Sequence, residues 1–181
     1  SDYITGGSLN PNNGSGLGRF QAAMHIRRNS RLNCFNSVAI GWPIGLILDN
    51  EKGDTQSAAT NGLMKLNNIW LVNTDEVGTD FNKIYDDHLY NYTTKTVDDT
   101  QQSFSHTFFV KDANNNKVLA DASSLLLSDP VSARASFMPQ AGSPMLSAAS
   151  FTNSLLGSWF SKVNYIGAFA QGDTWMTGWT N

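Results

Sequence analysis

Residues 35–40 read FNSVAI and residues 66–71 read LNNIWL. Each of these two hexapeptides has one apolar residue, then two small polar residues, then a short apolar run. Asparagine adopts the left-handed backbone conformation that a tight corner needs at lower cost than most residues. We therefore interpret the hexapeptides as the same corner in two successive coils of a solenoid, with Asn36, Asn67 and Asn68 as structural corner residues. In such a solenoid the side-chain amides of Asn36 and Asn67 would stack along the axis.

Short apolar runs separated by Asn, Ser and Gly surround the hexapeptides and predict strands of only a few residues. These strands are expected at 34–35, 38–40, 46–48, 63–66 and 69–72. These patterns predict a mainly β fold class, a β solenoid with an irregular aromatic-rich C-terminal end and one or two short helices. A solenoid generally needs at least three repeats, so an antiparallel β-sandwich stays open on the pattern alone.

The length of 181 residues suits a single domain, 1–181, with a real core. We expect four consecutive parts along it. Residues 1–24 form a loop and a lead-in strand, and 25–72 form the β-helix coils. Residues 73–130 form an irregular cover with strands, and 131–181 form the C-terminal cap.

Local patterns refine this plan outside the coils. Residues 5–18 are rich in Gly and Asn and predict a surface loop. The spacing of apolar residues predicts short helices over 81–92 and 154–163. Alternation of apolar and polar residues predicts a strand over 104–110.

Composition excludes several classes of protein. Hydrophobic residues make up 40% of the chain, which is too many for an intrinsically disordered protein. A net charge of -3 gives no long-range attraction to nucleic acid. The longest apolar stretch, 38–48, contains Gly41, Pro43 and Gly45, so we expect no membrane insertion by this chain. Cys34 is the single cysteine, which excludes an intrachain disulfide and suggests a small buried residue.

No catalytic residue, metal site or cofactor is predicted. The three histidines lie far apart in the sequence and lack the spacing of zinc motifs. Residues 112–117 look like the opening of a calcium loop, but Lys117 replaces its glycine and Ser123 its bidentate glutamate. We interpret this segment as a hairpin turn between 108–110 and 118–119.

Four basic residues near the first hexapeptide are the candidate ligand-binding residues: His25, Arg27, Arg28 and Arg31. On a strand, His25 and Arg27 would share one face, where a polysaccharide lyase could use them to neutralise a uronate and abstract a proton. The alternative is structural, with Arg28 bonding turn carbonyls or a buried acid such as Asp49.

Six segments carry a family resemblance: 25–30, 35–38, 41–46, 137–144, 165–169 and 175–179. They resemble a family of largely uncharacterised Bacteroidetes-type surface proteins. The resemblance implies an exported protein that winds a right-handed parallel β-helix, with this chain supplying the last coils and the closure. It also implies a location at the cell surface, on the outer membrane or outside the cell. We therefore expect a fragment, whose partner is the missing N-terminal part of its own β-helix or another envelope protein.

Six large aromatic residues crowd the end of the chain and are expected to cap the terminal coil. They are Trp159, Phe160, Tyr165, Phe169, Trp175 and Trp179. A solenoid end exposes apolar surface and strand edges, and large aromatic side chains can cover both. The alternative is a platform on which sugar rings stack.

The function predicted from the sequence is a non-enzymatic binding or structural module at the cell surface or outer membrane, for which a glycan is a candidate ligand. The first alternative is a carbohydrate-active enzyme of β-helix type, similar to a polysaccharide lyase. The second is an accessory subunit of an outer-membrane assembly. An open groove with Arg27, a carboxylate and exposed aromatic residues would favour the enzyme.

Overall fold

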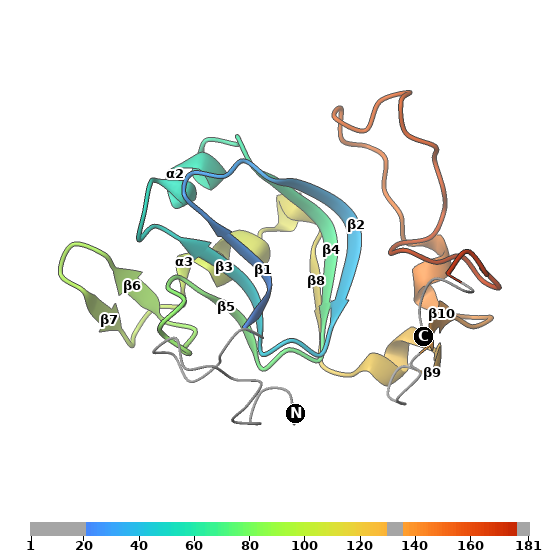
Figure 1. The fold of residues 1–181 in the computed structure, drawn as a ribbon, viewed down its shortest axis with the longest axis horizontal. Helices are drawn as coiled ribbons and strands as arrows, with labels where there is room; N and C mark the ends of the chain where they lie inside the picture. The colour runs from blue at the N-terminus through green and yellow to red at the C-terminus, as the bar shows by residue number, and fades with distance from the viewer. Residues whose placement is uncertain (1–20, 130–135, 177–181) are drawn as a thin grey trace.

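The computed structural model describes residues 21–129 and 136–176. The predicted loop 5–18 and Trp179 lie outside these residues. Two three-stranded parallel sheets form the body of the molecule (Figure 1). The first sheet has the order β1 (Ala22–Arg27), β3 (Ile44–Asp49), β5 (Glu76–Thr79). The second has the order β2 (Asn33–Ile40), β4 (Lys65–Val72), β8 (Lys117–Leu119).

Two small antiparallel hairpins lie outside this body. One joins β6 (Leu89–Asn91) to β7 (Thr96–Asp98), and Figure 1 shows it beyond the first sheet. The other joins β9 (Leu127–Asp129) to β10 (Ser136–Pro139), beyond the second sheet. The short helices are α2 (Thr55–Thr60), α3 (Phe104–Phe109), η1 (Asp112–Asn114), η2 (Ala122–Leu125) and η3 (Pro144–Ser147).

The main core lies between the two parallel sheets and helix α3. Its buried side chains include Ile26, Leu46, Leu48, Leu66, Leu71, Phe108 and Phe109. The sheets approach closely at Gly45, where a Cβ atom would lie 2.2 Å from Leu71 Cδ1 and 2.7 Å from the Val77 carbonyl oxygen. Only glycine fits there without displacing backbone. A second core cluster, with Trp70, Met145 and Ile166, joins the second sheet to the C-terminal segment.

The predicted right-handed parallel β-helix is wrong. In the described residues the strands form four small, separate sheets, two parallel and two antiparallel, and no solenoid. Parallel neighbours are joined by connections of unequal length: Ala22 pairs with Ile44, whereas Trp70 pairs with Lys117. The predicted strands at 34–35, 38–40, 46–48 and 69–72 are confirmed, because β2, β3 and β4 cover them. The strand expected over 63–66 is confirmed only for its second half, because β4 begins at Lys65.

The asparagine corner is present, with a different register. Asn36 and Asn68 have left-handed backbones, with φ of 51° and 56°. Asn68 Nδ2 donates to Asn36 Oδ1 at 2.7 Å, and Asn115 Nδ2 donates to Asn68 Oδ1 at 3.1 Å. Asn67 lies opposite Phe35 instead, and its amide donates to Asn114. The stacked pair is therefore Asn36 with Asn68.

Four local predictions are wrong. Residues 104–110 contain helix α3, because Ser103 Oγ accepts the His106 N–H and the Asp80 carboxylate accepts the N–H groups of Phe104 and Ser105. Turns and β6 replace the helix expected over 81–92, and turns replace the one expected over 154–163. Strand β8 pairs in parallel with β4, so the hairpin expected around 112–117 does not form.

Helices that could cross a membrane are not found in the part of the chain that the structure describes.

Candidate functional site

The predicted ligand residues His25 and Arg27 project from β1 toward an acid on β3. The register places Arg27 opposite Asp49, whose side chain is fully buried. His25 Nε2 lies 3.3 Å from Asp49 Oδ2, and Arg27 Nε lies 3.9 Å from the same oxygen. Arg27 Nη2 also donates to Glu51 Oε2 at 3.1 Å. We call His25, Arg27, Asp49 and Glu51 the charged cluster.

Tyr92, from the turn between β6 and β7, closes the charged cluster. Its hydroxyl lies 3.1 Å from Asp49 Oδ1, contacts the Asp80 carbonyl, and accepts the Asn50 N–H at 2.9 Å. Burial raises the pKa of Asp49, but hydrogen bonds from His25, from the Glu51 N–H and from Tyr92 outweigh it and leave the pKa below its ordinary value. Both carboxylates therefore have cationic partners within the protein, since Lys83 Nζ also lies 3.5 Å from Glu51 Oε1.

Arg28 and Arg31 do not join His25 and Arg27. Both are exposed in the connection that follows β1, and Arg28 has a left-handed backbone with φ of 57°. The structure thus brings together only two of the four basic residues proposed for ligand binding. Those two face a buried carboxylate.

A second group of hydrogen-bonding side chains, which the sequence did not indicate, lies at the start of α3. His106 Nδ1 contacts Asp87 Oδ2, and Ser103 Oγ donates to Asp87 Oδ1 at 2.6 Å. Because the serine hydroxyl donates to the acid and accepts the His106 N–H, it serves as the helix cap. Groups of three His, Cys, Asp or Glu that could hold a metal ion do not occur among the described residues.

The predicted aromatic cap is largely exposed. Trp159 is 91% exposed, Trp175 is 58% and Phe160 is 48%. Phe169 and Trp175 stack on each other, with ring centroids 5.3 Å apart. Smaller side chains cover the second sheet instead, since Ile166 and Met145 are buried in its cluster.

A long loop, residues 150–165, stands out beside β2 in Figure 1. Asn36 anchors it at both ends. The Asn36 side chain donates to the Ser150 carbonyl at 3.0 Å and accepts the Ser150 N–H at 2.9 Å. The Asn36 carbonyl accepts the N–H of Gly167 at 2.9 Å. One corner residue thus holds the loop against the sheet.

The space between this loop and β2 is an open groove of about 630 Å³, which we call the aromatic groove. It is lined by Asn33, Cys34, Phe35, Asn36, Phe151, Leu155, Leu156, Phe160 and Ser161. None of these residues is charged. Three aromatic rings, two side-chain amides and one hydroxyl group therefore share one recess. Its volume lies in the range of about 300–1,000 Å³ that is usual for ligand sites.

A smaller recess of about 130 Å³, the amide pocket, lies on another side of Phe35, which lines both. Its lining is almost entirely polar and uncharged: Asn67, Asn68, Asn114, Asn115, Asn153, Ser150 and Thr152, with Phe35 and Ala113. The asparagine corner supplies Asn68 and Asn115. Asn67 Oδ1 is buried without a hydrogen-bond partner.

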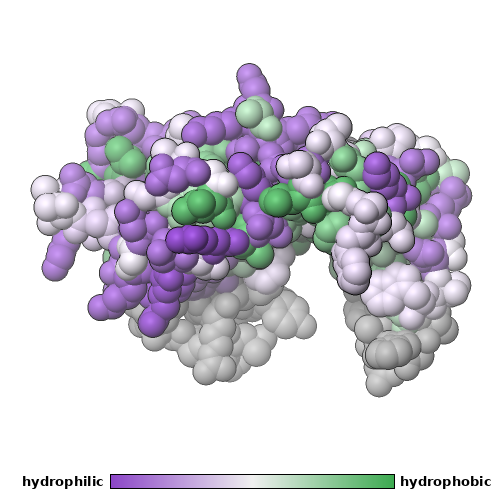
Figure 2. Space-filling view, turned by 90° about the horizontal axis from the view of Figure 1, so that it is seen from above, coloured by the Kyte–Doolittle hydropathy of each residue, from purple (hydrophilic) through white to green (hydrophobic). Residues whose placement is uncertain are grey.

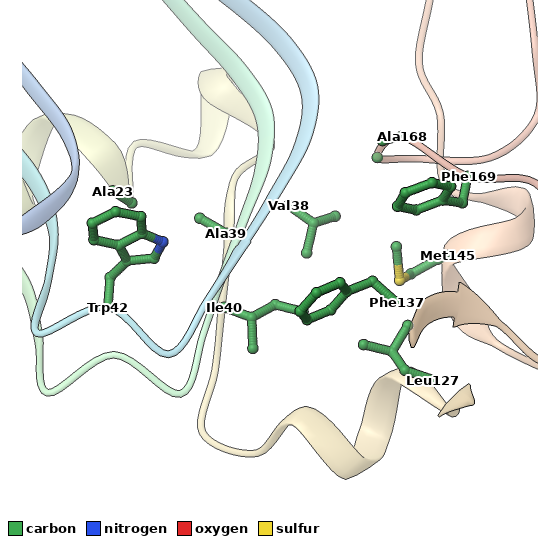
Figure 3. A pocket seen from close by; sticks show the side chains of 11 residues that line it. Ala23, Val38, Ala39, Ile40, Trp42, Leu127, Phe137, Met145, Ala168 and Phe169 are labelled. Atoms are coloured by element: carbon green, nitrogen blue, oxygen red, sulfur yellow. The ribbon is translucent and has the colours of Figure 1, made fainter. Parts of the chain in front are cut away.

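A third recess, the apolar pocket, has a volume of about 300 Å³ and lies between β2 and the C-terminal segment. Figure 3 shows Val38 and Ile40 pointing from β2 toward Phe137, Met145 and Phe169, while Ala39 projects to the other side. Figure 2 shows hydrophobic patches in the middle and right of the face seen there, with a mainly hydrophilic surface on the left.

Sequence reasoning found the asparagines of the corner and the aromatic tail, but not the recesses between them. Phe35 was interpreted as part of a strand and Phe160 as part of a cap. Their common groove depends on the loop 150–165 returning to Asn36, which local patterns do not indicate. One sequence signal was available: residues 150–161 contain large apolar side chains among Ser, Thr and Asn.

In comparisons with known proteins, no protein-family model, no curated protein and no solved structure matched this chain.

Proposed function

We propose that this chain is a non-catalytic binding module that holds a neutral glycan in the aromatic groove. The observation that carries the proposal is the composition of the groove: Phe35, Phe151 and Phe160 beside amide and hydroxyl groups, without a charged residue. A sugar ring has an apolar face of C–H groups and a rim of hydroxyl groups. Aromatic side chains bury the face, and amide side chains bond the rim.

Trp159 adds to this proposal. It adjoins Phe160 in the sequence, and its side chain is 91% exposed. Large exposed aromatic side chains beside a recess commonly mark interaction sites. Trp159 does not line the groove, and in this proposal it extends the stacking surface next to Phe160.

The uncharged lining favours a neutral glycan over a uronate and binding over hydrolysis. A glycosidase needs two carboxylic groups beside the scissile bond, and the groove lining contains none. The lyase-like alternative relies on His25 and Arg27, which contact Asp49 and do not line the groove. In this proposal the charged cluster is structural.

The same proposal places the module outside the cell, at the surface, on the outer membrane or free in the medium. Its support is the resemblance of six short segments within 25–46 and 137–179 to exported surface proteins. Another envelope protein is then the proposed partner.

Calorimetric titration with soluble dextran, laminarin, mannan and xylan tests the function, with alginate as the charged comparator. We expect one neutral polysaccharide to bind and alginate not to bind. Phe160→Ala should weaken that binding about tenfold or more, because burying an aromatic side chain contributes roughly 1.5–3 kcal/mol and 1.4 kcal/mol is a tenfold change. Trp159→Ala should weaken it less.

Trp175→Ala is the matched control. Trp175 is also exposed, but it stacks on Phe169 and does not line the groove. It should leave binding unchanged. Equal losses in Phe160→Ala and Trp175→Ala, or no binding of any neutral polysaccharide, would contradict the proposal.

A further inference from the structure

We infer that the glycan continues past Phe35 into the amide pocket, so that the ligand is an oligosaccharide whose next unit is recognised by hydrogen bonds from asparagine side chains. This inference rests on the proposed function. Its structural basis is that Phe35 lines both the aromatic groove and the amide pocket. A chain that stacks on Phe35 therefore reaches the second recess with its neighbouring unit.

The chemistry of the amide pocket suits sugar hydroxyl groups. Amide side chains offer both donors and acceptors in a small space, and a sugar hydroxyl can donate and accept at once. A polar recess of about 130 Å³ is large enough and polar enough to hold water. Hydroxyl groups can reproduce the hydrogen bonds of displaced water, whereas an apolar group cannot.

One acceptor in the amide pocket, Asn67 Oδ1, lacks a hydrogen-bond partner. Asn67 Nδ2 faces Asn114, with distances of 3.4 Å to both the carbonyl oxygen and Oδ1 of Asn114, while Asn67 Oδ1 is buried and unbonded. Such an unpaired acceptor costs folding free energy. The bonds that hold the amide in place are long and weak. A rotation of this loosely held amide would bring Oδ1 to a ligand hydroxyl, and the hydrogen bond so formed would recover this cost on binding.

Part of the rim of the pocket is open to solvent. Thr152 is exposed and Asn153 is half-buried, and both belong to the loop that also carries Phe151 and Phe160. One loop therefore contributes to both recesses. In this arrangement one sugar unit stacks in the aromatic groove, and the next unit along the oligosaccharide is hydrogen-bonded in the amide pocket.

The test is the dependence of affinity on chain length. Calorimetry would use purified gluco-, manno- and xylo-oligosaccharides of increasing length on the wild type and on Ala113→Trp. Ala113 is exposed in η1 and lines the amide pocket, so a tryptophan there fills the pocket without disturbing the core. Ala120→Trp is the matched control, because Ala120 is also exposed and lines neither recess.

The wild type should bind long oligosaccharides at least tenfold more tightly than the shortest one that binds. Ala113→Trp should lose this gain and keep the affinity for the shortest ligand, and Ala120→Trp should keep both. Asn67→Leu, which removes the acceptor at similar size, should lose part of the gain. An unchanged length dependence in Ala113→Trp and Asn67→Leu would overturn the inference but leave the proposed function standing, provided that Phe160→Ala still weakens binding. If the wild type binds no oligosaccharide, both proposals fail.

Discussion

The side-chain amide of Asn68 donates to Asn36 Oδ1 at 2.7 Å, and both residues have left-handed backbones. This pair joins the corners of β2 and β4. Asn36 Oδ1 also accepts the N–H of Ser150, so the corner and the loop of the aromatic groove share one amide. The geometry of the groove therefore depends on the same residue that turns the chain.

Replacement of Asn36 should destabilise the fold and loosen the loop. We expect Asn36→Ala to lower the free energy of unfolding by about 2–4 kcal/mol, since it loses three hydrogen bonds of about 1 kcal/mol each and strains a positive φ by about 1 kcal/mol. Asn36→Gly loses the same hydrogen bonds but carries no strain at a positive φ. Its free energy of unfolding should therefore be about 1 kcal/mol higher than that of Asn36→Ala. Urea denaturation measures both values, and equal stability of the two variants would show that the left-handed backbone carries no cost.

Asp80 should be essential for helix α3. Its Oδ2 accepts the N–H groups of Phe104 and Tyr90, and its Oδ1 accepts the N–H of Ser105. The NH₂ group of Asp80→Asn would face N–H donors, which should lower the free energy of unfolding by about 2–4 kcal/mol. Urea denaturation compares it with Asp99→Asn, an exposed control that should change stability by less than about 0.5 kcal/mol. Similar values for both variants would contradict this role.

Asn36 and Asp80 show which features of the fold the local sequence predicts and which it does not. Asparagine at the corner was predictable, because few residues tolerate a left-handed backbone. Its partner was assigned to Asn67 rather than Asn68, because aligning apolar residues does not reveal which backbone groups pair. The helix at 104–109 was predicted as a strand from its alternation. The cap Ser103 was a usable local signal, but the carboxylate that accepts the N–H groups of Phe104 and Ser105 belongs to Asp80, which directly follows β5.

Only part of the candidate site could be predicted from the sequence. His25 and Arg27 share a face as β-strand alternation requires, but the acid that neutralises them comes from β3. Tail aromatics were expected to be buried, although burial depends on what packs against them. The return of Ser150 and Gly167 to Asn36 creates the groove, and it joins residues more than a hundred positions apart. Local propensity carries no information about such contacts.

Asp49 should contribute stability that depends on pH. Its folded-state pKa lies below the ordinary value of 3.8, so its contribution is complete above that pH and is lost as the pH falls through the lowered pKa. Asp49→Asn should be less stable than the wild type by about 1–3 kcal/mol at pH 7, because His25 and Arg27 then face a neutral group.

Urea denaturation from about pH 7 down to pH 2 measures the difference between wild type and Asp49→Asn, which should shrink below about pH 4. Asp80 has the opposite sign: burial raises its pKa and outweighs its hydrogen bonds from Ser105 and Phe104, so its protonation favours the folded state. It therefore cannot cause the acid loss attributed to Asp49. A difference that stays constant over this range would contradict the assignment.

Binding of a neutral glycan in the aromatic groove should be nearly independent of salt. The groove lining carries no charge, so raising the salt concentration from about 0.05 to 0.5 M should change the affinity less than twofold. The lyase-like alternative predicts the reverse, because a uronate held by His25 and Arg27 would be released by salt. Calorimetry with the best neutral polysaccharide and with alginate separates the two. Salt-sensitive binding of alginate that Arg27→Gln abolishes would move the binding site from the groove to the charged cluster.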